Sequence, residues 1–148
     1  MDIERYLAAI DKLCSRPFPA EHGMSDVGMA GPGYFIAELA TSHRLTTADA
    51  VERIQTAEDF HDVKEIISER LNGRWGRQQV PWSLLTLRVR VDRGEEIPEP
   101  YLTVSHDVDE LNVWEVDGTG RWFAIGVADR QQDEEIRLLG TVTETPQP

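Results

Sequence analysis

The 148-residue chain contains a single cysteine, Cys14, so it forms no internal disulfide and holds no cysteine-based metal cluster. No run approaches the ~18 consecutive apolar residues that a membrane-spanning helix needs. The first residues mix acidic and basic side chains and lack the apolar core of a signal peptide. These absences favour a cytoplasmic protein that binds no membrane.

Basic residues are scarce. Fifteen Lys and Arg stand against 27 Asp and Glu, which gives a net charge of −12 and a pI near 4.7. Nucleic acids and anionic membranes both need basic side chains against their phosphates, so neither is an expected partner. Hydrophobic residues make up 40% of the chain and charged residues 28%, as in ordinary globular domains. We therefore expect one domain over residues 1–148, helical over about 1–75 and a sheet over about 80–144.

Motifs of catalytic and metal-binding sites are also missing. There is no nucleophile elbow, phosphate-binding loop or His-Glu-x-x-His pair. The segment Ser105–Glu110 combines His106 with acidic residues, but its spacing fits no calcium loop. Glu21 and His22 are candidates for a base oriented by a carboxylate, although adjacent loop residues are more often simply exposed. We predict no catalytic residue, metal or cofactor, and leave enzymatic activity open.

Apolar spacing predicts helices in the first half of the chain. They are expected over residues 2–14, 34–40, 48–56 and 57–71. Asp2 is placed to cap the first of them, and Thr46 and Thr47 the third. Asn72-Gly73 is a predicted stop.

Two further features of this half bear on function. Val51, Ile54 and Ile66 are expected to face inward from their helices. The stretch Ser15–Gly33 is rich in proline and glycine and is predicted to be a long loop. A loop of this length is usually functional or mobile, so it is a candidate lid.

Strands are predicted in the second half, over residues 85–91, 101–105, 111–116, 121–127 and 136–142. Apolar and polar residues alternate through Leu85–Val91, as in a half-buried strand. Short links between strands favour antiparallel pairing. The sequence therefore predicts an α+β fold, with N-terminal helices packed on a C-terminal, mostly antiparallel sheet of about five strands.

The turn Asp117–Gly120 is a strong hairpin signal, because glycine adopts the positive φ angles of tight turns. Counting outward from it pairs Val116 with Arg121, and Trp114 with Phe123. Trp122 then faces the opposite side from Trp114. One tryptophan is expected in the core and the other, Trp122, as an exposed binding anchor.

Acidic residues cluster in the predicted links between strands, and two clusters meet if their links share an end of the sheet. We expect such a surface to attract a basic protein partner. The predicted partner-binding residues are Asp107, Asp109, Glu110, Trp122, Asp133, Glu134 and Glu135. In general character the chain is similar to the small acidic immunity proteins that neutralise basic toxins, although no motif assigns it to a family.

Two alternatives remain open at this point. The chain is either a small-molecule-binding or enzymatic domain, with a pocket between helices and sheet lidded by residues 15–33, or a structural subunit. In the second alternative an exposed tryptophan and a strand edge pair with another copy, giving a homodimer.

Overall fold

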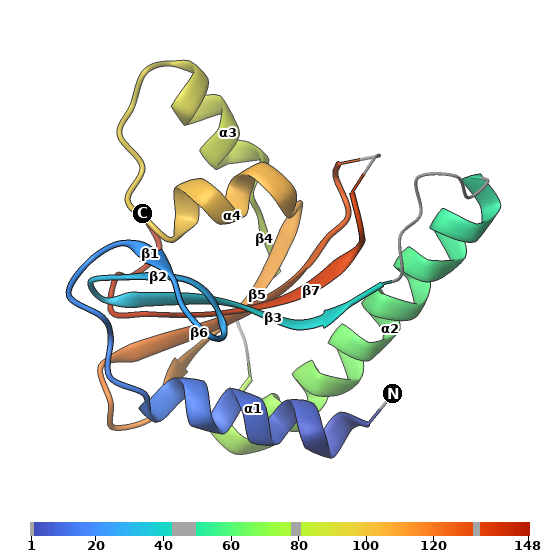
Figure 1. Ribbon diagram of the computed structural model, residues 1–148, viewed down its shortest axis with the longest axis horizontal. Coiled ribbons are helices and arrows are strands. Elements are labelled where there is room, and N and C mark those ends of the chain that lie inside the picture. Colours follow the sequence, from blue (N-terminus) through green and yellow to red (C-terminus); the bar gives the residue numbers. More distant parts are fainter. Residues whose placement is uncertain (1, 43–49, 78–80, 132–133) are drawn as a thin grey trace.

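The computed structural model describes residues 2–42, 50–77, 81–131 and 134–148. Within these ranges the chain is an α+β protein with four helices and an antiparallel sheet of seven strands (Figure 1). In chain order the elements are α1 (Ile3–Ser15), β1 (Gly23–Met24), β2 (Gly28–Gly31), β3 (Tyr34–Thr41), α2 (Ala50–Trp75), β4 (Trp82–Ser83), α3 (Leu85–Asp92), α4 (Tyr101–Asp107), β5 (Glu110–Val116), β6 (Arg121–Ala128) and β7 (Arg137–Thr143).

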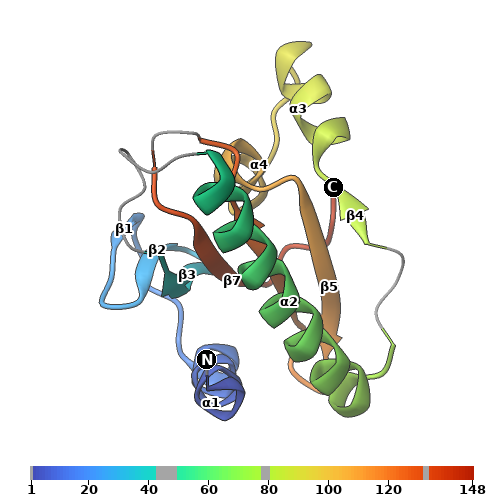
Figure 2. The same ribbon diagram turned by 90° about the vertical axis from the view of Figure 1, so that its right-hand side faces the viewer.

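The strands lie in the order β1-β2-β3-β7-β6-β5-β4, so β7 joins the two halves of the sheet. Helices α1 and α2 cover one face, where Ile67 and Phe123 share a core. Helices α3 and α4 cover the other, where Leu87 and Val104 pack in a second core with Ala124. Figure 2 shows α2 lying obliquely across the strands.

Several predicted elements are confirmed. Helix α1 begins after Asp2, whose carboxylate accepts a hydrogen bond from the Arg5 backbone N–H at 3.3 Å. The β5–β6 hairpin has the predicted register, including the Trp114–Phe123 pair. Gly118 in its turn has a φ of +74°. The last predicted strand is β7.

The predicted strand over residues 85–91 is wrong, because these residues form α3. Leu84 and Leu87 are buried three residues apart, whereas Leu85 and Val89 are 58% and 40% exposed. The apolar residues of this segment fit a period of two and helical spacing equally well. Packing of the Leu84–Leu87 side of the segment on the sheet decides in favour of the helix.

The predicted strand over residues 101–105 is wrong for a similar reason. The segment lies in α4, where Tyr101 and Val104 are buried at helical spacing. The Glu99 carboxylate accepts a hydrogen bond from the Thr103 N–H at 3.0 Å, so it satisfies a free donor at the start of the helix.

The helix favoured for residues 34–40 is also wrong, because this segment forms β3 between β2 and β7. Tyr34, Phe35 and Ile36 are residue types typical of strands, and all three are buried. The stretch Ser15–Gly33, predicted to be irregular, contains β1 and β2. The sheet therefore has seven strands instead of five, and helices interleave with them.

Residues 50–75 form one continuous helix, where two were predicted, and Asn72-Gly73 does not end it. The helix ends at Trp75, and Gly76 after it has a φ of +87° and donates its N–H to the Asn72 carbonyl at 3.1 Å. The predicted caps, Thr46 and Thr47, lie outside the described residues.

Candidate functional site

The sheet end where β6 finishes and β7 begins gathers several of the predicted acidic residues around one arginine. Arg137 lies 3.1 Å from the carboxylate of Asp107 and 3.7 Å from that of Glu134. It also approaches Glu38 of β3 at 3.6 Å. Two of the predicted acidic clusters therefore meet here, but around a guanidinium that offsets their charge.

Asp109 is shared between two further arginines. Its Oδ1 accepts hydrogen bonds at 3.1 Å from both Arg88 and Arg130. Arg88 also donates to the carbonyls of Ser105 at 2.9 Å and Val108 at 3.1 Å. This network ties α3 to the turn after α4, and it leaves the Asp109 carboxylate locally balanced.

Glu110 lies 3.9 Å from the ammonium of Lys64, which projects from α2. Lys64 is 2% exposed, and its burial lowers the pKa of its ammonium. The carboxylates of Glu110, Glu65 and Asp129 oppose that shift. The charge of Glu110 is therefore attracted to a cation in the core.

The remaining predicted residues are dispersed. Glu135 is half-buried, and Asp133 lies outside the described residues. Trp122 is half-buried at the start of β6, while the acidic residues surround its end at Ala128. Six residues of strand separate these points, or about 20 Å. The structure therefore does not bring Trp122 together with the acidic loops. Trp114, the other tryptophan of the hairpin, is buried in the core as expected.

The link between β6 and β7 is fastened to α2. The Arg53 guanidinium donates to the carbonyls of Asp129 at 3.3 Å, Gln131 at 2.7 Å and Glu134 at 2.9 Å. His61 Nε2 lies 3.0 Å from the Asp129 carboxylate. Arginines thus orient this end of the sheet as well as offsetting its carboxylates.

A line of unpaired carboxylates runs instead along the outer face of α2. It consists of Glu58, Asp62, Glu65 and Glu69, whose spacing of three or four residues places them on one side of the helix. All four are exposed, and in the described part of the chain none makes a hydrogen bond or an ion pair. Such like charges repel one another along a helix.

Two aliphatic residues begin the same line. Val51 is 74% exposed and Ile54 is 59% exposed. Ile66, beside the acids, is 45% exposed. The prediction that these three residues face inward is therefore wrong. We call Val51, Ile54, Glu58, Asp62, Glu65 and Glu69 the α2 stripe. It spans about 27 Å at 1.5 Å per residue. The regular spacing of its acids is visible in the sequence, but the sequence does not show that Val51 and Ile54 lie on the same exposed side of the helix.

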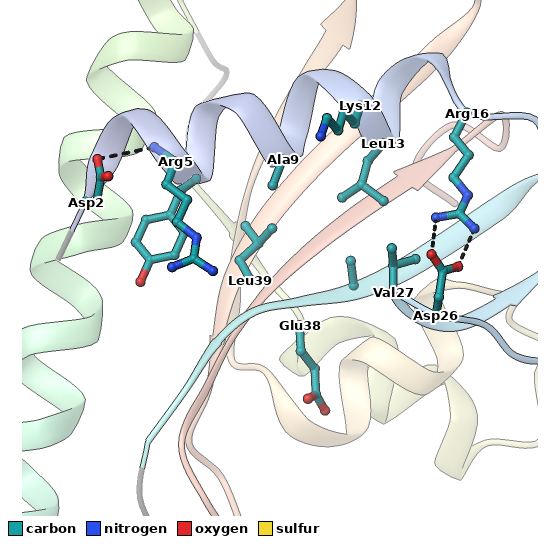
Figure 3. Close-up of a pocket in the computed structure, with 12 residues that line it drawn as sticks. Asp2, Arg5, Ala9, Lys12, Leu13, Arg16, Asp26, Val27, Glu38 and Leu39 are labelled. Atoms are coloured by element: carbon teal, nitrogen blue, oxygen red, sulfur yellow. Dashed lines mark hydrogen bonds and ion pairs between the residues drawn. The ribbon is translucent and has the colours of Figure 1, made fainter.

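A pocket of about 730 Å³ lies between α1 and the β2–β3 hairpin. Its apolar lining consists of Tyr6, Ala9, Leu13, Val27, Ala37 and Leu39. Figure 3 shows Leu39 and Val27 pointing toward α1, whereas Glu38 points away from it. The segment predicted as a lid does contribute here, through Arg16, Asp26 and Val27.

The residues considered for catalysis have other roles in the structure. His22 Nδ1 lies 2.8 Å from the Tyr34 hydroxyl, and burial, together with the Glu99 carboxylate, raises the pKa of Tyr34. Glu21 is exposed. Burial raises the pKa of the Cys14 thiol to about 12. Across the described ranges, no group of three His, Cys, Asp or Glu is placed to hold a metal.

In the part of the chain that the structure covers, no helix has both the length and the apolar character to cross a membrane. Comparisons of the chain with protein-family models, curated proteins and solved structures gave no match. Its candidate surfaces are therefore judged on their own chemistry.

Proposed function

We propose that this protein binds a basic protein partner through the α2 stripe. The supporting observation is the line of four exposed, unpaired carboxylates preceded by the exposed side chains of Val51 and Ile54. Like charges at helical spacing weaken a helix, and exposed aliphatic groups gain nothing in water. A partner with basic and apolar groups at matching positions relieves both penalties.

The acidic and aliphatic parts of the stripe contribute differently to binding. Exposed carboxylates accelerate encounter with a cationic surface and make the association rate sensitive to salt. Burial of Val51 and Ile54 adds about 1.5–3 kcal/mol for each side chain that becomes fully covered. The carboxylates therefore select the partner, and the aliphatic end slows its dissociation.

The shape of the stripe suits an amphipathic basic helix. Such a helix, laid along α2, carries Arg or Lys at intervals of three or four residues and apolar residues at one end. A protein that covers a basic surface in this way acts as an inhibitor, and an immunity protein against a basic toxin is one function of this kind.

The sheet end is the weaker candidate surface. Asp107, Asp109 and Glu134 each lie within 4 Å of an arginine of this chain. A basic partner has to share these carboxylates with arginines that already bind them, which reduces the free energy gained on binding. No acid of the α2 stripe forms an ion pair with a cation among the described residues, although Glu65 attracts the buried Lys64 ammonium.

The test compares two charge reversals of equal size. The first variant carries Asp62→Lys and Glu65→Lys in the α2 stripe. The control carries Asp92→Lys and Glu96→Lys, which change exposed residues of α3 and the link that follows it, beyond the opposite face of the sheet. Tagged wild type and both variants are used to capture proteins from a lysate of the source cells, which are eluted with a salt gradient and identified by mass spectrometry.

We expect wild type and control to retain the same basic protein until moderate salt, and the α2 variant to lose it. Loss from both variants would contradict a defined site and indicate attraction by net charge alone. A third variant, Glu134→Lys with Glu135→Lys, tests the sheet end. If this variant alone lost the captured protein, the binding surface would be the sheet end and the proposal for the α2 stripe would be wrong. If the only captured protein were a second copy of this chain, and high salt did not release it, the result would contradict a basic partner and indicate a homo-oligomer.

A further inference from the structure

Three cations line one wall of the pocket between α1 and the β2–β3 hairpin. Arg5 and Lys12 are seven residues apart, which places them along one side of α1, and Arg16 follows the helix as its C-cap. Arg16 donates two hydrogen bonds to the Asp26 carboxylate and is thereby engaged (Figure 3). The side chains of Arg5 and Lys12 make no hydrogen bond or ion pair within the described ranges.

Among the described residues, the acidic side chains that line the pocket form no ion pair with Arg5 or Lys12. Asp2 accepts the Arg5 backbone N–H as the cap of α1, and Asp26 binds Arg16. Glu38 points away from α1 and lies 3.6 Å from Arg137. Arg5 and Lys12 are therefore lining cations without an ion-pair partner in the described part of the chain, and both can attract an anion.

The rest of the pocket is suited to an apolar body. Tyr6, Ala9 and Leu13 form the α1 side, and Val27 and Leu39 face them from the hairpin. A volume of about 730 Å³ lies within the range of pockets that enclose small molecules, about 300–1,000 Å³. The combination of an apolar floor and a cationic rim matches a ligand with one apolar and one anionic part.

We propose that this pocket binds a small amphipathic carboxylate with a medium-length alkyl chain. The alkyl chain lies between α1 and the hairpin, and the carboxylate meets the guanidinium of Arg5, which lines the pocket (Figure 3). The Lys12 ammonium, two turns further along α1, adds a weaker attraction for the same carboxylate. One anionic charge is sufficient, because Arg16 is already bound to Asp26. This site is independent of the α2 stripe.

The probes are octanoate, octanol and octylamine, which share a chain length and differ in charge. Each is titrated into the ¹⁵N-labelled full chain, and amide chemical shifts are followed by two-dimensional NMR. We expect saturable shifts with octanoate at Tyr6, Ala9, Leu13, Val27 and Leu39. Octanol should bind about tenfold more weakly, since a charged hydrogen bond contributes roughly this much.

Three variants locate the site. Arg5→Gln should weaken octanoate binding about tenfold while leaving octanol binding unchanged. Ala9→Trp fills the pocket and should abolish binding of both. Arg93→Gln, which removes an exposed cation after α3, is the matched control and should bind like wild type. Circular dichroism and thermal melting confirm that each variant is folded.

Equal affinity for octanoate and octanol would overturn the carboxylate assignment. The proposal also fails if octanoate, and the longer decanoate, cause no saturable shift, or if the shifts map to another surface. If Arg5→Gln and Arg93→Gln weaken binding equally, the attraction is not localised at the pocket and the proposal is likewise rejected.

Discussion

Lys64 places an ammonium in the core between α2 and β5 with one distant carboxylate, Glu110, as its ion-pair partner. Glu110 is half-exposed, so loss of Lys64 leaves no buried charge behind. We expect Lys64→Met, which keeps most of the side-chain volume, to stabilise the protein by about 1 kcal/mol at pH 7. Urea unfolding measures this, with Lys12→Met on the exposed side of α1 as the control.

The advantage of Lys64→Met should depend on pH in a definite direction. The pKa of Lys64 is lower in the folded state than its ordinary value of 10.5. Between the folded-state pKa of Lys64 and 10.5, the unfolded wild type binds more protons than the folded wild type. The free energy of unfolding of wild type therefore rises with pH in this range, whereas the methionine of the Lys64→Met variant does not titrate. The gap between variant and wild type should therefore narrow toward pH 10.5, and a gap that widened would contradict this account.

Cys14 should be inert in the folded protein. The thiolate is the reactive form, and a pKa of about 12 leaves very little of it at pH 8. We expect modification by a disulfide reagent to be roughly a thousandfold slower than for a free cysteine. The same chain in guanidinium chloride is the control and should react quickly. Rapid labelling in native buffer would show that Cys14 is reached through local opening.

Single residues also show where sequence reasoning succeeds and fails. Asp2 and Gly118 were identified correctly, because capping and positive φ are local requirements that particular residue types meet. Val51 and Ile54 were misplaced, because hydrophobicity does not reveal which side of a helix meets a sheet. The partners of Asp107 and Asp109 come from other elements, and nothing local predicts them.

Helix α2 carries repulsion along its outer face, so relief of that repulsion should strengthen it. Asp62→Lys places opposite charges four residues after Glu58 and three before Glu65, and we expect about 0.5 kcal/mol of added stability at low salt. Urea unfolding at two salt concentrations measures the gain, which should shrink as salt rises. Asp92→Lys is the control. A destabilised Asp62→Lys protein would mean that the carboxylate has a structural role.

The contact between α2 and the β6–β7 link should depend on Arg53. Arg53→Met removes hydrogen bonds to three carbonyls and should cost about 2 kcal/mol. Hydrogen exchange should accelerate around Asp129–Gln131. Arg70→Met, which breaks an exposed pair with Glu4, should cost less than about 0.5 kcal/mol. Equal effects of the two changes would refute a special role for Arg53.

Whole elements were predictable where one periodicity dominated. Helix α1 and the β5–β6 hairpin carry a single clear pattern and were correct. Leu85–Val91 satisfies two patterns, and residues 34–40 are too short for either to prevail. In both segments the choice is made by packing, which places Leu87 in one core and Phe35 in the other. A short segment of sequence does not predict such tertiary packing.

At the scale of the molecule, the two cores share the strands between them, so we expect them to unfold together. Phe123 and Ala124 are neighbours in β6 yet point into different cores. Tryptophan fluorescence reports Trp114 in one core and Trp82 beside the other, while far-UV circular dichroism reports the backbone. The two signals should follow one urea transition. Two separated transitions would show that the faces are independent units.

Sheet order was beyond prediction, because β3 and β7 pair across about a hundred residues of chain with no local signal of their partnership. That pairing also has a consequence for synthesis. β7 is the last of the strands in the described part of the chain, but it lies between β3 and β6. While the protein is being translated, both of these strands must wait with an open edge until β7 emerges. A nascent chain that ends between β6 and β7 thus contains a divided sheet with two open edges, and we expect this form to be the most exposed to aggregation.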